Sequence, residues 1–187
     1  PHQLEDIYNF EDALLVGSIL ITMLRHADRV KIGCLAQLVN VIAPIMTSDT
    51  GAWRQTIFYP YMHAATMGQG TVLNTIVNSP VYEAKQHGES PYLDCVVVEN
   101  DEKNELVVFA VNKDLEEDME MTLDMRQFED YRVVEHIVMQ NDDLKAVNTE
   151  ENPNCVAPRT GGNSKVDQGI LTAVFEKKSW NVIRLAK

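Results

Sequence analysis

The spacing of apolar residues changes near residue 71, and this change restricts the folds open to the chain. Before it, apolar residues repeat at helical spacing, and one short run is largely apolar. After it, short segments alternate between polar and apolar residues and are separated by polar turns. Helical repeats beside a buried strand are typical of an α/β unit, whereas alternating segments are typical of antiparallel sheets. We therefore predict an α/β part over residues 1–72 and an all-β sandwich over residues 73–187.

The first part is expected to hold two helices and one strand. Asn9 can cap a helix that has Asp12 at its third position and continues to Leu24. A second helix is expected over residues 57–67, where Gly68 would end it. This order of helix, strand, loop and helix matches the closing unit of an α/β barrel, although one strand cannot form a barrel.

Residues 30–39 are the predicted strand, because the run is mostly apolar and has small residues at Gly33 and Ala36. Gln37 lies near its carboxyl end, where barrel enzymes hold their substrates. An amide at this place can contact a substrate, or it can satisfy buried backbone groups. On spacing alone, the structural role is the better interpretation.

Period-two alternation predicts the strands of the second part. Residues 93–98 and 105–111 should form a hairpin across the polar turn at 99–104. Four more strands are expected, over residues 119–125, 131–139, 171–175 and 180–185. The segment 141–169 is rich in Asn, Asp, Pro and Gly and should form an exposed loop.

Charge and composition argue against several kinds of partner. The formal net charge is −12, which disfavours binding to nucleic acid or to an anionic membrane surface. Of the 28 Asp and Glu residues, 6 lie in residues 1–80 and 22 in residues 81–187, which fits a well solvated second part. The longest apolar stretch, residues 13–24, is too short to span a bilayer.

Cysteines and histidines give no sign of a disulfide framework, a metal site or a cofactor. Three widely spaced cysteines without a CxxC pair indicate a reducing compartment, and we expect the cytoplasm. Three histidines without metal-ligand spacing and both tryptophans are expected to be structural: His26, His63, His136, Trp53 and Trp180.

Three blocks of the sequence resemble one enzyme family. They are LEDIYNFEDAL at residues 4–14, HADRVKI at 26–32 leading to QLVNVIAPI at 37–45, and SWNVIRL at 179–185. Together they are similar to the carboxyl-terminal part of a glycoside hydrolase family 51 α-L-arabinofuranosidase, nearly from end to end. The resemblance implies the last part of a (β/α)8 TIM barrel, with its eighth strand at residues 30–39, followed by a jelly-roll β-sandwich domain.

The resemblance also implies a reaction. Such enzymes hydrolyse terminal non-reducing α-L-arabinofuranosyl residues from arabinan, arabinoxylan and their oligosaccharides, with retention. Retention needs two carboxyl groups roughly 5 to 5.5 Å apart, and the family supplies both as glutamates from earlier barrel strands. None of the acids in the first part lies at the end of the predicted strand: Glu5, Asp6, Glu11, Asp12, Asp28 and Asp49. We therefore expect no catalytic residue here, and activity only together with the upstream part of the same enzyme.

Two residues are carried over from the family as substrate contacts. Gln37 matches a substrate-contacting amide and can pair with a sugar hydroxyl without adding a charge. Ile42 would line the aglycone side of the site, although packing beside Pro44 is the other interpretation. No metal or cofactor is implied, and we expect a homo-oligomer.

A non-catalytic module is the alternative function, in which the sandwich binds carbohydrate or another protein and the helical segment is a stalk. Such a module would leave residues 30–39 with unpaired edges and exposed apolar faces. The enzyme interpretation is therefore preferred.

Overall fold

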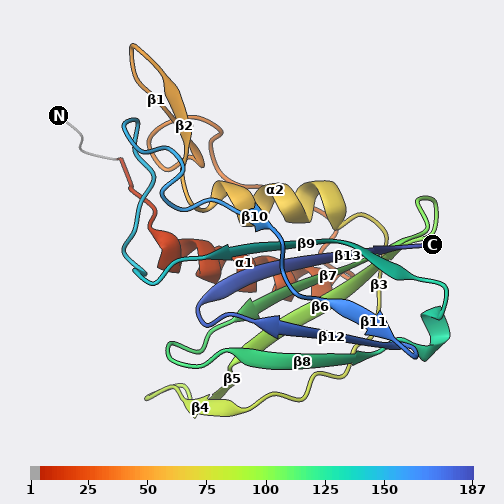
Figure 1. The fold of residues 1–187 in the computed structure, drawn as a ribbon. Helices are drawn as coiled ribbons and strands as arrows, with labels where there is room; N and C mark the ends of the chain where they lie inside the picture. Colours follow the sequence, from red (N-terminus) through yellow and green to blue (C-terminus); the bar gives the residue numbers. More distant parts are fainter. Residues whose placement is uncertain (1–4) are drawn as a thin grey trace.

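The alternating segments form two antiparallel sheets that pack face to face. The computed structural model describes residues 5–187, and Figure 1 shows its ribbon. Pro1 to Leu4 lie outside the described residues, and so does the first residue of the block that begins at Leu4.

The larger sheet has six strands in the order β10-β9-β13-β7-β6-β3. In chain order they are β3 (Thr71–Val72), β6 (Leu93–Asn100), β7 (Glu105–Asn112), β9 (Arg132–Gln140), β10 (Arg159–Thr160) and β13 (Ser179–Ala186). The smaller sheet has the order β11-β12-β8. Its strands are β8 (Met119–Asp124), β11 (Lys165–Asp167) and β12 (Ile170–Phe175).

The strands predicted from alternation are confirmed. The expected hairpin is β6 and β7, which pair in register from Leu93 opposite Asn112 to Asn100 opposite Glu105. The other four predicted strands correspond to β8, β9, β12 and β13. The loop after β9 is correct in outline, but it also contributes the short strands β10 and β11.

The remaining elements are short. Two hairpins lie outside the main sheets, β1 (Ile45–Thr47) with β2 (Ala52–Arg54), and β4 (Val81–Glu83) with β5 (Glu89–Pro91). A 3₁₀ helix, η1, spans Arg126–Phe128. Figure 1 shows the β1–β2 hairpin projecting from the body of the molecule.

The strand β7 is apolar on both faces because each face meets a different layer. Leu106 and Val108 belong to the core between the two sheets, together with Leu171 and Phe175 of β12. Phe109, one residue further along, belongs to a second core on the outer side of the larger sheet. Successive side chains of a strand point to opposite faces, so a strand covered on both sides loses its polar positions.

The helix α1 (Phe10–Arg25) covers that outer face and begins as predicted. Asn9 Oδ1 accepts a hydrogen bond from the Asp12 backbone N–H at 3.1 Å, and Asp12 Oδ2 accepts one from the Asn9 N–H at 2.8 Å. This reciprocal pair is a capping box, which satisfies two donors that a helix start leaves free. The second predicted helix is α2 (Phe58–Met67), and Gly68 caps its carboxyl end.

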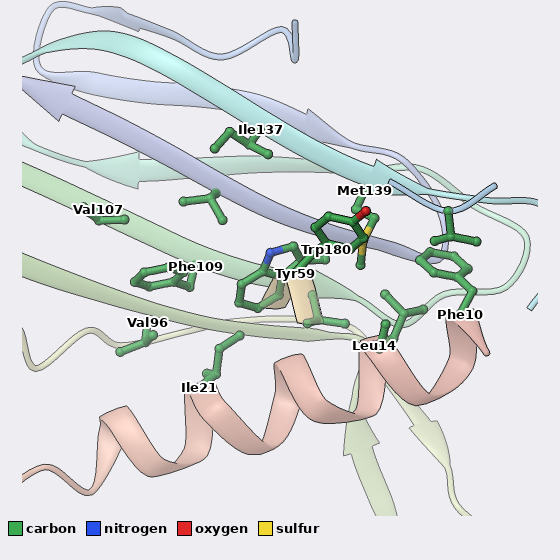
Figure 2. Packing of buried hydrophobic residues seen from close by; sticks show 14 of the residues in the cluster. Phe10, Leu14, Ile21, Tyr59, Val96, Val107, Phe109, Ile137, Met139 and Trp180 are labelled. Carbon is green, nitrogen blue, oxygen red and sulfur yellow. The ribbon is translucent and has the colours of Figure 1, made fainter. Parts of the chain in front are cut away.

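Trp180 of β13 is the centre of the outer core and is fully buried. Figure 2 shows Leu14 and Ile21 of α1 beside it, together with Phe109 and with Tyr59 of α2. The tryptophan Nε1–H donates to Nδ1 of buried His63 at 3.0 Å. Burial lowers the pKa of His63 to about 4, so the ring stays neutral and accepts this bond.

The structural roles predicted for Trp180 and His63 are confirmed by their burial and by the hydrogen bond between them. His136 is also buried, but its Nδ1 has no hydrogen-bond partner among the described residues. The ring of His136 lies 3.3 Å from Asn181 Oδ1 through its Nε2. Trp53 is half-buried in β2, and His26 is exposed after α1, within hydrogen-bonding distance of Arg29.

Gly17 is the position where α1 approaches the sheet most tightly. A Cβ atom at this glycine would lie 2.7 Å from Cε3 of Trp180 and 3.2 Å from Cγ2 of Val111. Both neighbours belong to the buried outer core, so neither is the free end of a flexible side chain.

We expect Gly17→Ala to destabilise the protein by up to about 2 kcal/mol, because overpacking a core outweighs the gain of about 1 kcal/mol that alanine normally brings to a helix. Chemical denaturation measures the change. The same substitution in a Trp180→Phe background is the matched control, and there the penalty should shrink because the clashing ring is smaller. A Gly17→Ala variant more stable than the parent would contradict this account of the packing.

The strand expected over residues 30–39 is not formed, and this prediction is wrong for the structure described here. The segment is irregular, and Ile32 and Leu38 are 82% and 70% exposed. Its single ladder contact is an isolated parallel bridge between Val39 and Ile45. A strand needs hydrogen-bonded neighbours on its edges, and residues 5–187 offer this segment none beyond that bridge. Residues 5–187 therefore do not confirm the predicted barrel end.

In the part of the chain that the structure describes, no helix is long and apolar enough to cross a membrane.

Candidate functional site

The two predicted substrate contacts lie on one loop, residues 37–43, between the irregular segment and β1. Gln37 is exposed, and within residues 5–187 its side-chain amide makes no hydrogen bond. The Ile42 side chain is 37% exposed. The structural interpretation of Gln37, as an amide that satisfies buried backbone groups, does not fit this exposed position. Both side chains are accessible for contact with another molecule.

The backbone of the 37–43 loop is strained. Gln37, Asn40 and Val41 have positive φ angles of 57°, 60° and 62°. Asparagine tolerates this left-handed region, but a β-branched valine there is an outlier. Each such residue costs on the order of 1–3 kcal/mol and persists only where the surroundings hold it in place.

Buried Gln55 provides much of that support from just after β2. Its Oε1 accepts from the Tyr8 backbone N–H at 2.9 Å, and its Nε2 donates to the Ala43 carbonyl at 2.8 Å and the Asp6 carbonyl at 3.1 Å. One side chain thus ties the loop to the segment before α1. No periodic pattern of residues indicates this role, because the partners of Gln55 are backbone groups between 12 and 49 residues away.

The segment before α1 also holds the loop directly. The Asp6 backbone N–H donates to the Val41 carbonyl at 2.8 Å, and Tyr8 Oη donates to the Ile42 carbonyl at 3.1 Å. Burial, with a smaller effect from nearby carboxylates, raises the pKa of Tyr8. The phenol therefore remains a hydrogen-bond donor over the ordinary pH range.

Asn40 connects the loop to β1 through side-chain hydrogen bonds. Its Oδ1 accepts from the Thr47 backbone N–H at 2.7 Å, and its Nδ2 donates to Thr47 Oγ1 at 2.8 Å. The hairpin is held in turn by Glu150, whose Oε1 accepts from Ser48 Oγ at 2.7 Å and Thr50 Oγ1 at 2.6 Å. These two hydroxyl donors lower the pKa of the Glu150 carboxyl.

Two acids at the start of α1 have structural partners. Asp12 closes the capping box, and Glu11 forms an ion pair with Lys145. Residues 5–187 contain no group of three or more potential metal ligands from His, Cys, Asp and Glu. What the loop presents to solvent is the exposed Gln37 amide, whose donors and acceptor suit a polar ligand.

Comparison with known proteins gives a consistent result. A family model described as the α-L-arabinofuranosidase carboxyl-terminal domain matches residues 1–179. The intracellular exo-α-(1→5)-L-arabinofuranosidase of Halalkalibacterium halodurans is 57% identical over 188 residues, covering 100% of this chain and 37% of that protein. Intracellular exo-α-(1→5)-L-arabinofuranosidase 1 of Bacillus subtilis is 57% identical over 185 residues, covering 98% of this chain and 37% of that protein. The chain thus spans little more than a third of the length of these relatives.

Solved structures agree at the level of the fold. A family 51 α-L-arabinofuranosidase from Bifidobacterium longum superposes with a TM-score of 0.91 at 36% identity, covering 98% of this chain and 36% of that one. A family 51 arabinofuranosidase from Xanthomonas axonopodis pv. citri has the same fold, with a TM-score of 0.84 at 20% identity, covering 97% of this chain and 36% of that one.

Proposed function

The chain belongs to glycoside hydrolase family 51, as an α-L-arabinofuranosidase carboxyl-terminal domain, and from this premise we propose its function. It is the carboxyl-terminal part of a retaining enzyme that removes terminal non-reducing α-L-arabinofuranosyl residues from arabinan, arabinoxylan and their oligosaccharides. The observation that carries the proposal is the match of the family model to residues 1–179.

The 37–43 loop is the part of this chain that meets the substrate. Gln37 offers an amide that has no hydrogen-bond partner within residues 5–187 and can donate to and accept from sugar hydroxyls without bringing a charge near the catalytic carboxyls. Ile42 presents an apolar surface on the aglycone side. Both catalytic glutamates come from the upstream segment, about 5 to 5.5 Å apart as retention requires. The reaction needs no cofactor.

The upstream segment also completes the fold. We assign residues 1–72 to the end of a TIM barrel and residues 73–187 to a jelly-roll sandwich. Barrel strands supplied by the upstream segment would give residues 30–39 the neighbours that this structure lacks. Exposed Ile32 and Leu38, and Leu15 and Ile19 on the outer face of α1, would then be covered.

The names of two relatives support a linkage and a location. Two relatives at 57% identity are named for exo action on (1→5) linkages, so α-1,5-linked arabinan is the first substrate to test. The same two are named intracellular, which supports a cytoplasmic location together with the unpaired cysteines. We also propose a homo-oligomer.

The proposal is tested by assaying residues 1–187 and the full-length protein side by side on 4-nitrophenyl α-L-arabinofuranoside. We expect turnover by the full-length protein and none by the isolated chain, because the chain lacks the carboxyl pair. Turnover by a mass-verified isolated chain would show that the catalytic acids lie within it. A folded full-length protein without activity on any arabinofuranoside would overturn the proposed reaction.

A further inference from the structure

Gln37 lies on a stretch of backbone that makes few hydrogen bonds within residues 5–187. Between Gly33, whose carbonyl accepts from Tyr61 Oη at 3.3 Å, and the N–H of Asn40, the backbone within residues 5–187 makes only the isolated bridge of Val39 with Ile45. The Gln37 side chain itself has no partner in this part of the chain. Its placement therefore depends on how firmly the backbone is held on its carboxyl side.

Asn40 holds the backbone on this side, and each of its polar groups takes part in a hydrogen bond. Its backbone N–H donates to the Ile45 carbonyl at 2.8 Å, and its carbonyl accepts from the Ala43 N–H at 3.0 Å. Its side chain makes the two bonds to Thr47 described above, at 2.7 and 2.8 Å. An amide with both ends engaged has one orientation, and it fixes the residue that bears it.

The same bonds offset the strain of the loop. Asn40 and Val41 both have left-handed backbone angles. Asn40 is held by the hydrogen bonds between its side chain and Thr47, which we call the clamp. Without the clamp, the backbone at Val41 would lower its conformational energy by relaxing to a negative φ angle. Relaxation there would move the residues on either side, Gln37 and Ile42, which the proposed function places at the substrate.

We propose that Asn40 is a positioning residue, which holds the Gln37 amide at the arabinofuranosyl hydroxyl through its clamp on Thr47. This inference rests on the proposed function, because it concerns the same site. Asn40 touches no substrate in this scheme. Its effect on the rate is transmitted by Gln37, since a hydrogen bond that strengthens in the transition state depends on the exact position of its donor.

The decisive variant is Asn40→Gly in the full-length protein. Glycine adopts a φ angle of 60° without strain, so this change removes the clamp and leaves the backbone conformation allowed. We expect kcat/KM on 4-nitrophenyl α-L-arabinofuranoside to fall roughly tenfold, with the loss mainly in kcat. Lys85→Gly is the matched control, because Lys85 also has a positive φ angle, 43°, but lies in the exposed β4–β5 turn. It should leave the kinetics unchanged.

The Thr47 side of the clamp gives an independent check. Thr47→Val removes the Oγ1 acceptor and keeps the backbone N–H donor, so we expect a smaller loss, about two- to fivefold. Thr47→Ser keeps the hydroxyl and should restore nearly normal kinetics. A Thr47→Ser variant as impaired as Thr47→Val would speak against the clamp.

A double-mutant cycle with Gln37→Ala separates this inference from the proposed function. If Asn40 acts through Gln37, Asn40→Gly should cause little further loss in the Gln37→Ala background. The same tenfold loss in both backgrounds would overturn the positioning role, and so would a lower melting temperature with unchanged kinetics. Gln37→Ala by itself tests the substrate contact. Normal kinetics in that variant would disprove the contact, and this result is distinct from the outcome of the double-mutant cycle.

Discussion

Replacing Trp180 with alanine should lower the free energy of unfolding by about 3 to 5 kcal/mol, the usual cost of removing a large aromatic side chain from a core. Trp180 of β13 is fully buried in the outer core, beside residues of both helices. Its ring is stacked near Phe109, with the ring centroids 5.8 Å apart, and its Nε1–H is the partner of His63. The substitution would therefore leave a cavity and a buried imidazole without its donor.

Trp53→Ala is the matched control, because it removes the same side chain from a half-buried position on the β1–β2 hairpin. Its cost should be about 1 kcal/mol or less. Both variants are compared with the parent by urea denaturation followed by backbone circular dichroism, which does not depend on tryptophan fluorescence. Equal losses for the two variants would mean that the outer core is not organised around Trp180.

The second large effect is expected at Gln37. In the full-length protein, Gln37→Ala should reduce kcat/KM roughly ten- to several hundred-fold, because hydrogen bonds to a sugar hydroxyl strengthen in an oxocarbenium-like transition state. The melting temperature should be unchanged, since Gln37 is exposed and its amide makes no bond within residues 5–187. Steady-state kinetics and thermal unfolding on one preparation measure both quantities.

Gln55→Ala provides the contrast for that experiment. Gln55 is buried and bonds three backbone groups of the loop and of the segment before α1, so its loss should lower the melting temperature as well as the activity. A structural amide and a substrate-binding amide thus give different results. A Gln37→Ala variant with normal kcat/KM would remove Gln37 from the site.

Local signals in the sequence predicted the longer helices and strands correctly. Alternation identified β6, β7, β8, β9, β12 and β13, because a strand with a buried face must repeat its apolar residues at every second position. The capping box at Asn9 and the helix end at Gly68 were also found, since each depends on residues only a few positions apart.

The same kind of signal failed at residues 30–39. Their composition suits a buried strand, but composition does not supply the neighbouring strands that backbone hydrogen bonding requires. The segment is irregular and exposed because residues 5–187 supply no strands beside it apart from the isolated bridge to Ile45. The sequence of the segment alone could not indicate this.

Some residues of the site could likewise be predicted from the sequence, and others could not. Resemblance to a family pointed to Gln37 and Ile42, but not to Tyr8, Asn40 or Gln55, which hold the loop that carries them. These three residues have no pattern of spacing, because each bonds a backbone group or side chain that folding alone brings near. The sequence by itself determined the long strands of the two sheets, the helix caps and the family. Only the tertiary structure decided how the 37–43 loop is held in a strained conformation, because that conformation depends on hydrogen bonds between residues up to 49 positions apart.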